Sequence, residues 1–171
     1  MKPEPSAPNA DGELNVRRLS GQWSRLGIAC HFVARHEPFA SFRSSELVNT
    51  LSAQIEREHC LFALQGSRVV GYFGWALYDA AVAERFARGA APPHNSLAHG
   101  RDVVWLLTAA AAHPRAPLAM GRALRAQYPG MRVMGIRHKA AGQRVVVDLA
   151  ARFAAPDGPA VAAPPASACV P

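Results

Sequence analysis

The amino-acid sequence predicts an α/β sandwich, in which helices flank a mostly antiparallel sheet. Apolar residues recur at helical spacing over residues 19–36 and 45–58. From residue 60 onward the period becomes that of strands separated by turn residues. The chain has 171 residues, 50% of them hydrophobic, which suits one domain with a sizeable core. We therefore expect a single domain over residues 14–153.

Two helices open the predicted domain. The first ends near His36, ahead of Pro38, because a proline disfavours helix in the residue before it. The second covers residues 45–58, where Ser44 or Ser45 can cap the helix and Glu46 suits its first turn. The expected buried faces consist of Leu19, Trp23, Leu26, Cys30 and Val33 in the first helix and Leu47, Leu51 and Ile55 in the second.

A β-hairpin follows the helices. Its strands are predicted over residues 60–64 and 68–77, with Gln65-Gly66-Ser67 as the turn between them. The second strand carries apolar residues on both faces, which is typical of a central strand. Within it Trp75 is expected to anchor the core, as is Trp105 further along the chain.

The second half of the domain alternates between strands and helices. The most strongly apolar segment, Val103-Val-Trp-Leu-Leu, predicts a buried strand that runs out through Thr108 into four alanines. A helix over 117–128 is stopped by Pro129-Gly130. The remaining predicted elements are a short helix over 79–88, a loop over 89–100, and two closing strands over 131–137 and 144–149 around Ala141-Gly142.

The positive charge is concentrated between two tails. Residues 1–13 and 154–171 are rich in alanine and proline, and their composition predicts disorder. The formal charge of the chain is +7, whereas residues 14–155 hold 18 basic and 8 acidic side chains, a net +10. Such a domain attracts polyanions and acidic proteins. We expect no nucleic-acid partner, because no stacking aromatic residues interleave with the basic ones.

Several classes of protein and site are disfavoured. No apolar run approaches the ~20 residues of a membrane span, and the amino terminus lacks the apolar core of a signal peptide. Three cysteines, Cys30, Cys60 and Cys169, are too few for a disulfide framework or a zinc site. Motifs for phosphate-binding loops and nucleophile elbows are absent. We expect a cytoplasmic protein without a bound metal.

An ordered set of segments resembles one known family. The run Cys60-Leu-Phe-Ala-Leu with Arg68-Val-Val-Gly-Tyr-Phe-Gly-Trp-Ala-Leu is similar to the hairpin of the RTX toxin-activating lysine acyltransferases, where the strand ends in Ser-Trp-Ala. Gly100-Arg-Asp-Val-Val-Trp-Leu-Leu is similar to the family's Gly-Asp-x-x-Trp segment, and Gly121-Arg-Ala-Leu-Arg-Ala-Gln-Tyr-Pro to its later helix. Leu26-Gly-Ile-Ala and Asn49-Thr-Leu-Ser-Ala resemble its opening helices, so the resemblance covers roughly residues 26–149.

The resemblance implies a fold and an activity. The family has a GNAT-like fold, and the predicted element order is itself like that of coenzyme A acyltransferases of the GNAT kind. Members transfer a fatty acyl group from acyl-acyl carrier protein to internal lysines of a protoxin. The resemblance thus implies no bound cofactor, acyl-acyl carrier protein as acyl donor, and an RTX-type protoxin as substrate. It leaves the oligomeric state open, with a homodimer among the options.

The resemblance also implies site residues. His36 is the nearest counterpart of the family's catalytic histidine and would act as general base; as a residue at a helix C-terminus it also suits the helix dipole. The family's catalytic aspartate aligns with Thr108, whose hydroxyl cannot carry a stabilising charge. Asn49, Arg122 and Arg125 are the expected substrate-binding residues, although the two arginines also fit a solvated helix face.

Two other functions remain as alternatives. The threonine at position 108 favours a non-catalytic relative that binds acyl carrier protein or a protein client. A coenzyme A-dependent acyltransferase would need a loop of the form Gln/Arg-x-x-Gly-x-Gly/Ala at a helix start. Gly121 and Ala123 fit this pattern, but Leu118 replaces its polar residue.

Overall fold

The structure is a computed structural model that describes residues 13–90, 99–138 and 144–148. The predicted tails lie outside the described residues, apart from Glu13, as does the turn around Ala141-Gly142. The described chain forms one six-stranded sheet in which sequential strands are neighbours. All pairs are antiparallel except the fourth and fifth strands, which are parallel. The predicted α/β sandwich is therefore confirmed.

The elements follow the predicted order with one addition at the start. The strands are β1 (Leu14–Arg17), β2 (Cys60–Gln65), β3 (Arg68–Tyr78), β4 (Val103–Ala111), β5 (Arg132–His138) and β6 (Arg144–Asp148). The helices are α1 (Gln22–Val33), α2 (Ser44–Glu56), α3 (Ala80–Ala87) and α4 (Ala116–Gln127), with a short 3-10 turn over Phe39–Ser41. The sequence analysis did not predict β1, which pairs along β2.

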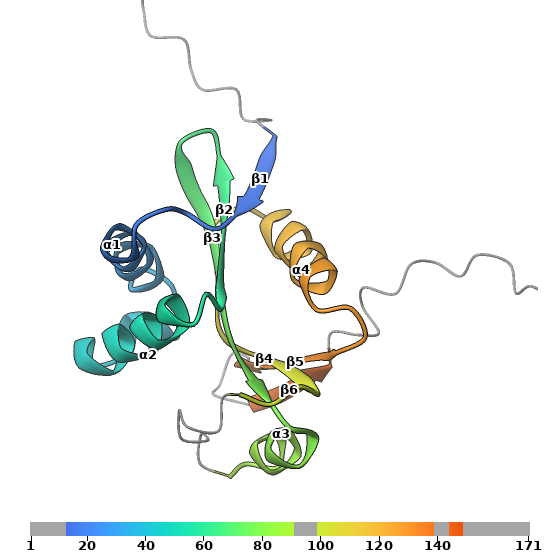
Figure 1. Cartoon of the computed structure of the whole chain (residues 1–171). Coiled ribbons are helices and arrows are strands. Elements are labelled where there is room, and N and C mark those ends of the chain that lie inside the picture. The colour runs from blue at the N-terminus through green and yellow to red at the C-terminus, as the bar shows by residue number, and fades with distance from the viewer. Residues whose placement is uncertain (1–12, 91–98, 139–143, 149–171) are drawn as a thin grey trace, which may run out of the picture.

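Helices cover both faces of the sheet. Figure 1 places α1 and α2 on one side of the long β2–β3 hairpin and α4 on the other. Side chains such as Phe62 and Tyr72 point toward α1 and α2, whereas Ala63 and Phe73, their neighbours along the strands, pack toward α4. The third helix packs at the opposite end of the sheet from the hairpin turn, around Phe86 and Trp105. This layering buries the core on both sides of a central β3.

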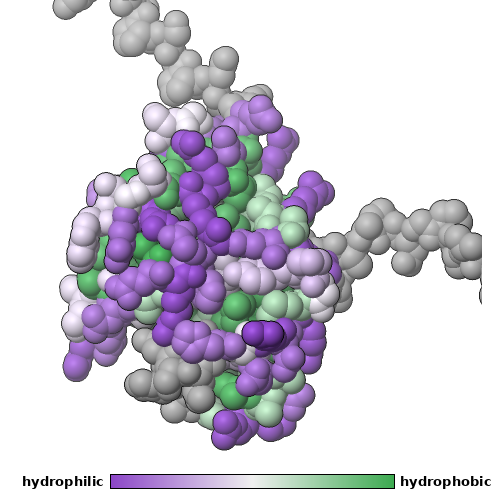
Figure 2. All heavy atoms as spheres, in the orientation of Figure 1, coloured by the Kyte–Doolittle hydropathy of each residue, from purple (hydrophilic) through white to green (hydrophobic). Residues whose placement is uncertain are grey.

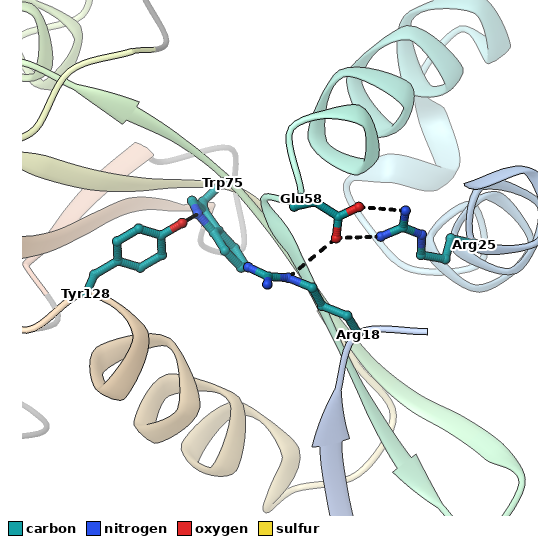
Figure 3. Close-up of polar contacts among 5 residues, drawn as sticks. All are labelled: Arg18, Arg25, Glu58, Trp75 and Tyr128. Atoms are coloured by element: carbon teal, nitrogen blue, oxygen red, sulfur yellow. Dashed lines mark hydrogen bonds and ion pairs between the residues drawn. The ribbon is translucent and has the colours of Figure 1, made fainter. Parts of the chain in front are cut away.

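Helix α1 buries most of the predicted face but not Trp23. Val33 is buried, and Leu19, Leu26 and Cys30 pack against the same core cluster. Trp23 is 78% exposed, so its predicted burial is wrong, and Arg25 and Ala29 are buried in addition. Arg25 is buried since both of its terminal nitrogens donate to Glu58, at 2.8 and 2.7 Å. Figure 3 shows Glu58 held between Arg25 and Arg18, whose Nε lies 3.8 Å from the carboxylate.

Helix α2 matches its prediction except at its start. Its predicted apolar stripe is buried, with Leu47, Leu51 and Ile55 each at most 6% exposed. The N-cap residue is Arg43, and no side chain caps the helix, so the predicted serine cap is wrong. Packing of the apolar face, rather than a cap, stabilises this helix, as is common for amphipathic helices.

A bulge interrupts the pairing of the two central strands. Gly74 of β3 pairs with Thr108 of β4, and the next residue, Trp75, pairs with Leu106, so Leu107 is the extra residue. The parallel pairing of β4 with β5 ends at the same level, with Leu106 opposite Gly135. Trp75 and Trp105 are 1% and 0% exposed, which confirms both as core anchors.

The described part of the chain has no membrane-spanning helix, no disulfide and no cluster of metal ligands. No helix there is long and apolar enough to cross a membrane. Cys30 and Cys60 are free thiols, and Cys169 lies outside this part. The described residues contain no group of three or more potential metal ligands.

Candidate active site

His36 follows α1 and is held by the last turn of the helix. Its backbone N–H donates to the Val33 carbonyl at 3.0 Å, and its ring Nδ1 lies 2.8 Å from the Phe32 carbonyl oxygen. The ring also packs on the Phe32 ring, with centroids 4.5 Å apart. A carbonyl oxygen only accepts, so Nδ1 must carry the proton of this bond. In the neutral form of the ring, this bond places the proton on Nδ1 and leaves Nε2 unprotonated, which is the tautomer that a general base requires.

A cleft of about 590 Å³ opens beside His36. Its volume falls in the range of small-molecule sites. Most of its lining comes from α1 and the turn after it, and the opposite wall comes from the start of β3 and the residue after β4. The lining residues are Gly27, Ile28, His31, Phe32, Arg35, His36, Arg68, Val69 and Ala112.

Two rows of side chains form the α1 side of the cleft, because residues four apart share a helix face. The inner row is Ile28, Phe32 and His36; Phe32 and His36 are half-buried, and Ile28 is 37% exposed. The outer row is Gly27, His31 and Arg35, all exposed. The inner row is thus apolar up to the imidazole at its end, whereas the outer row is polar.

Unpaired positive charge lies at this cleft. Arg35 contacts His31, with Nη1 3.4 Å from Nε2, and Arg68 approaches from the opposite wall. Neither arginine has a carboxylate of the described residues within 4.0 Å. Figure 2 shows hydrophilic residues over most of one face of the molecule, with apolar residues only in small patches between them. An apolar floor with cations above it suits a ligand that has an apolar part and an anionic part.

Thr108 lies in a different environment from His36. It is 1% exposed and does not line the cleft. Gln54 of α2 donates from Nε2 to the Thr108 hydroxyl at 3.0 Å, and the Tyr72 hydroxyl donates to Gln54 Oε1 at 2.9 Å. Burial raises the pKa of Tyr72 well above its ordinary value, so the phenol stays a donor. Thr108 is four strand residues from Ala112 in the cleft wall, about 13 Å along β4.

A glycine makes room for this buried network. Gly74 pairs directly with Thr108 across the strands. A Cβ atom at Gly74 would overlap the side-chain amide of Gln54. The amide of Gln54 therefore fills the space that a side chain at position 74 would occupy.

The predicted substrate-binding residues do not gather at the cleft. Asn49 is exposed on α2 and does not line it. Arg122 is exposed and Arg125 half-buried on α4, which packs on the other side of the sheet. The structure instead places Arg35 and Arg68 near His36, two residues that the sequence analysis did not select. The four-residue spacing of Ile28, Phe32 and His36 was the signal that could have located this row.

The candidate phosphate loop of the coenzyme A alternative falls inside a helix. The fourth helix begins at Ala116, so Leu118, Gly121 and Ala123 all lie within it. Gly121 is buried there against the sheet side of the helix. Backbone amides beyond the first turn are used by helix hydrogen bonds, so Gly121 and Ala123 do not form an amide cradle.

A second histidine lies on the α4 side of the sheet. The His59 ring stacks on Trp75, with centroids 6.0 Å apart, and the Trp75 Nε1–H donates to the Tyr128 hydroxyl at 3.1 Å; Figure 3 shows this last contact. The Nδ1 atom of His59 is buried without a hydrogen-bond partner. Burial, reinforced by nearby Arg57 and Arg18, lowers the pKa of His59 to about 4, so the ring is neutral near pH 7.

Comparison with known proteins assigns the family. The model of HlyC, the RTX toxin acyltransferase family, matches residues 22–150. The chain belongs to the RTX toxin acyltransferase family. The matched range includes the segments on which the resemblance rested, and it covers His36, the cleft and Thr108. Members of this family are acyltransferases that activate RTX toxins. No curated protein matches the chain.

Solved structures superpose on the chain at low sequence identity. The loading GNATL domain of CurA from Lyngbya majuscula is 15% identical with a TM-score of 0.49, and the alignment covers 73% of this chain and 65% of that one. The GphF GNAT-like decarboxylase is 20% identical with a TM-score of 0.45, covering 72% and 65%. An agmatine N-acetyltransferase is 14% identical with a TM-score of 0.48, covering 75% and 77%. The chain thus spans 65% of the length of the first two.

Proposed function

We propose that this member of the RTX toxin acyltransferase family transfers a fatty acyl group from acyl-acyl carrier protein to an internal lysine of an RTX-type protoxin. The observation that carries the proposal is the cleft beside His36. It combines a histidine whose neutral tautomer leaves Nε2 available to accept a proton with an apolar floor and two arginines that have no carboxylate of the described residues within 4.0 Å.

Acyl transfer from a thioester to a lysine needs one general base near the thioester carbonyl. A lysine amine attacks the thioester carbonyl, so that a C–N bond forms and the C–S bond breaks. His36 Nε2 takes the proton released by the attacking nitrogen and passes it to the departing thiolate sulfur. A positioned general base of this kind contributes about 10²–10⁴-fold to a rate. Because His36 Nδ1 is committed to the Phe32 carbonyl, the ring is held in the tautomer that this role requires.

The positive charge of the domain supports a carrier protein as donor. Residues 14–155 carry a net +10, and carrier proteins are acidic. Charge complementarity of this kind speeds encounter and orients a partner more than it adds affinity. Arg35 and Arg68 at the cleft would meet acidic side chains of the carrier as it delivers its acyl group.

Co-expression tests the proposed function. The chain is produced with the RTX-type protoxin and acyl carrier protein, and the intact mass of the protoxin is measured. We expect a mass increase equal to one or more acyl groups, mapped to lysine by fragmentation, and none when the chain is left out. An unmodified protoxin in the presence of chain and acylated carrier contradicts the proposal.

A binding-only relative is the second candidate, and the environment of Thr108 favours it. The position of the family aspartate holds a buried hydroxyl bonded to Gln54, with no carboxylate to stabilise an imidazolium. A protein of this kind would bind acylated carrier or protoxin without transferring the acyl group. Calorimetry with acylated carrier, run beside the mass measurement, separates the candidates: binding with no transfer supports this one, and transfer excludes it.

A further inference from the structure

The inner row of the cleft is an apolar track that ends at the proposed base. Ile28, Phe32 and His36 are spaced four residues apart, and Val69 and Ala112 supply apolar surface on the opposite wall. Ile28 lies within α1, which ends at Val33, and His36 lies in the turn just beyond that end. A substrate whose reacting carbonyl sits at His36 would therefore run its apolar end toward Ile28.

Exposed apolar surface at Ile28 lacks a structural role in the described chain. Ile28 is 37% exposed and does not belong to the buried clusters of the core. Beside it, Gly27 leaves open space, since a Cβ there would have no atom within 4 Å. The end of the track away from His36 is thus open to solvent, so a ligand could lie against Ile28.

The cationic side chains around the track indicate that the ligand also has an anionic part. Arg35 and Arg68 offer guanidinium groups, and His31 adds a polar ring, all above the apolar floor. Guanidinium groups suit carboxylate or phosphate. An acyl thioester of phosphopantetheine combines an apolar chain with an anionic carrier, and both acyl carrier protein and coenzyme A supply that chemistry.

We propose that the acyl chain of the thioester lies along Phe32 and Ile28 and that the space beside Ile28 admits the distal part of a long chain. This inference rests on the proposed function, since it takes the thioester as substrate. It assigns a specificity-determining residue eight positions before the base in the sequence, at a position that touches neither the carbonyl nor the lysine.

Chain-length competition tests the role of Ile28. Octanoyl and palmitoyl groups are offered on acyl carrier protein, and in a second arm on coenzyme A, to the wild type, Ile28→Trp and Ile28→Ala. Ile28→Trp should lower kcat/KM for the palmitoyl donor about tenfold relative to the octanoyl donor, and Ile28→Ala should not. Ile28→Phe is the milder variant if Ile28→Trp fails to fold. Activity in one arm alone identifies the thioester source.

Val48 supplies a matched control. It is 38% exposed on α2 and does not line the cleft, so Val48→Trp places the same tryptophan on a comparably exposed surface elsewhere. An unchanged chain-length ratio in Ile28→Trp and Ile28→Phe, or an equal change in Val48→Trp, overturns the inference while the proposed function stands.

Direct binding keeps the inference testable if no transfer occurs. The fluorescent long-chain fatty acid cis-parinaric acid is titrated into the full chain and the same variants. Weaker binding by Ile28→Trp than by Val48→Trp supports the apolar track even where the proposed function has failed. Equal binding by both variants contradicts it.

Discussion

The two positions that the family resemblance pairs in catalysis, His36 and Thr108, occupy opposite environments. His36 lies half-buried in a cleft, with one ring nitrogen fixed by a backbone carbonyl and, within the described part of the chain, no hydrogen bond at the other. Thr108 is 1% exposed and takes part in a hydrogen-bond chain with Gln54 and Tyr72. The first environment suits proton transfer to a substrate, and the second suits the ordering of a core. We therefore expect the proposed chemistry to take place in the cleft.

The buried network accommodates a neutral side chain at position 108. A carboxylate there would be an unpaired charge in the core, which is costly. The hydroxyl of Thr108 is neutral and has a partner, and Gly74 supplies the space that the Gln54 amide needs. The resemblance aligns Gly74 with the serine of the family's Ser-Trp-Ala segment. The three residues therefore fit together as an uncharged group: Gly74, Gln54 and Thr108.

The largest effect expected from the cleft side follows from reversing its charge. The double variant Arg35→Glu with Arg68→Glu should raise KM for the acylated carrier about a hundredfold, because like charges across an interface cost several kcal/mol. Steady-state kinetics at low and high salt measure it, and the loss should shrink as salt screens the repulsion. Arg85→Glu should leave KM unchanged, because Arg85 is an exposed residue of α3 at the other end of the sheet. Equal effects from both would refute the cleft as the docking point.

On the buried side, Gly74→Val should destabilise the fold by about 1–3 kcal/mol through overpacking. The added side chain displaces the Gln54 amide and breaks its bonds to Thr108 and Tyr72. Urea unfolding measures the change. Gly27→Ala is the contrasting variant, since the cleft leaves room for its methyl group, and removing a helix-interior glycine should stabilise by about 0.5–1 kcal/mol. A neutral Gly74→Val would show that the network is loosely packed.

The Arg25–Glu58 pair joins α1 to the end of α2, and Arg25→Met should cost about 1–2 kcal/mol. Arg25 lowers the pKa of Glu58 through its hydrogen bonds. The contribution of the pair is therefore present above the ordinary glutamate pKa of ~4.3 and is lost as pH falls through the lower folded value. Urea midpoints across this range should converge for wild type and Arg25→Met at the acid end. Parallel curves would contradict the ion pair.

The last stability prediction concerns His59. Its folded pKa of about 4 lies below the ordinary value of ~6.5, so the unfolded chain binds more protons between these values. Stability should therefore fall as the pH drops from 6.5 toward 4. His59→Gln should flatten this slope in denaturant midpoints, while His31→Gln, at an exposed position on α1, should retain it. An unchanged slope in His59→Gln would place the proton uptake elsewhere.

Local sequence patterns predicted those elements of the fold that depend mainly on their own residues. The alternation of β2 and β3, the turn at Gly66 and the stripe around Leu51 in α2 are all present. The short β1 was missed because Leu14–Arg17 alternates apolar and polar residues over only four positions next to a tail of biased composition. Its pairing with β2 supplies the stability that its own sequence lacks.

The site was less predictable because its contacts are long-range. Gln54 and Thr108 are 54 residues apart in sequence, and Arg25 reaches Glu58 across 33. Composition gave the positive charge but not its location, so Arg122 and Arg125 were selected and Arg35 and Arg68 were not. His36 was selected through the resemblance, and its role as base stays a prediction.

One acylation assay tests the central claim that the cleft, and not position 108, carries the chemistry. Intact-mass kinetics of protoxin acylation are compared for the wild type, His36→Gln and Thr108→Val. The account predicts a loss of about 10²–10⁴-fold for His36→Gln and a rate for Thr108→Val within about fivefold of wild type once each variant is confirmed as folded. A fully active His36→Gln, or a Thr108→Val as inactive as His36→Gln is expected to be, would contradict it.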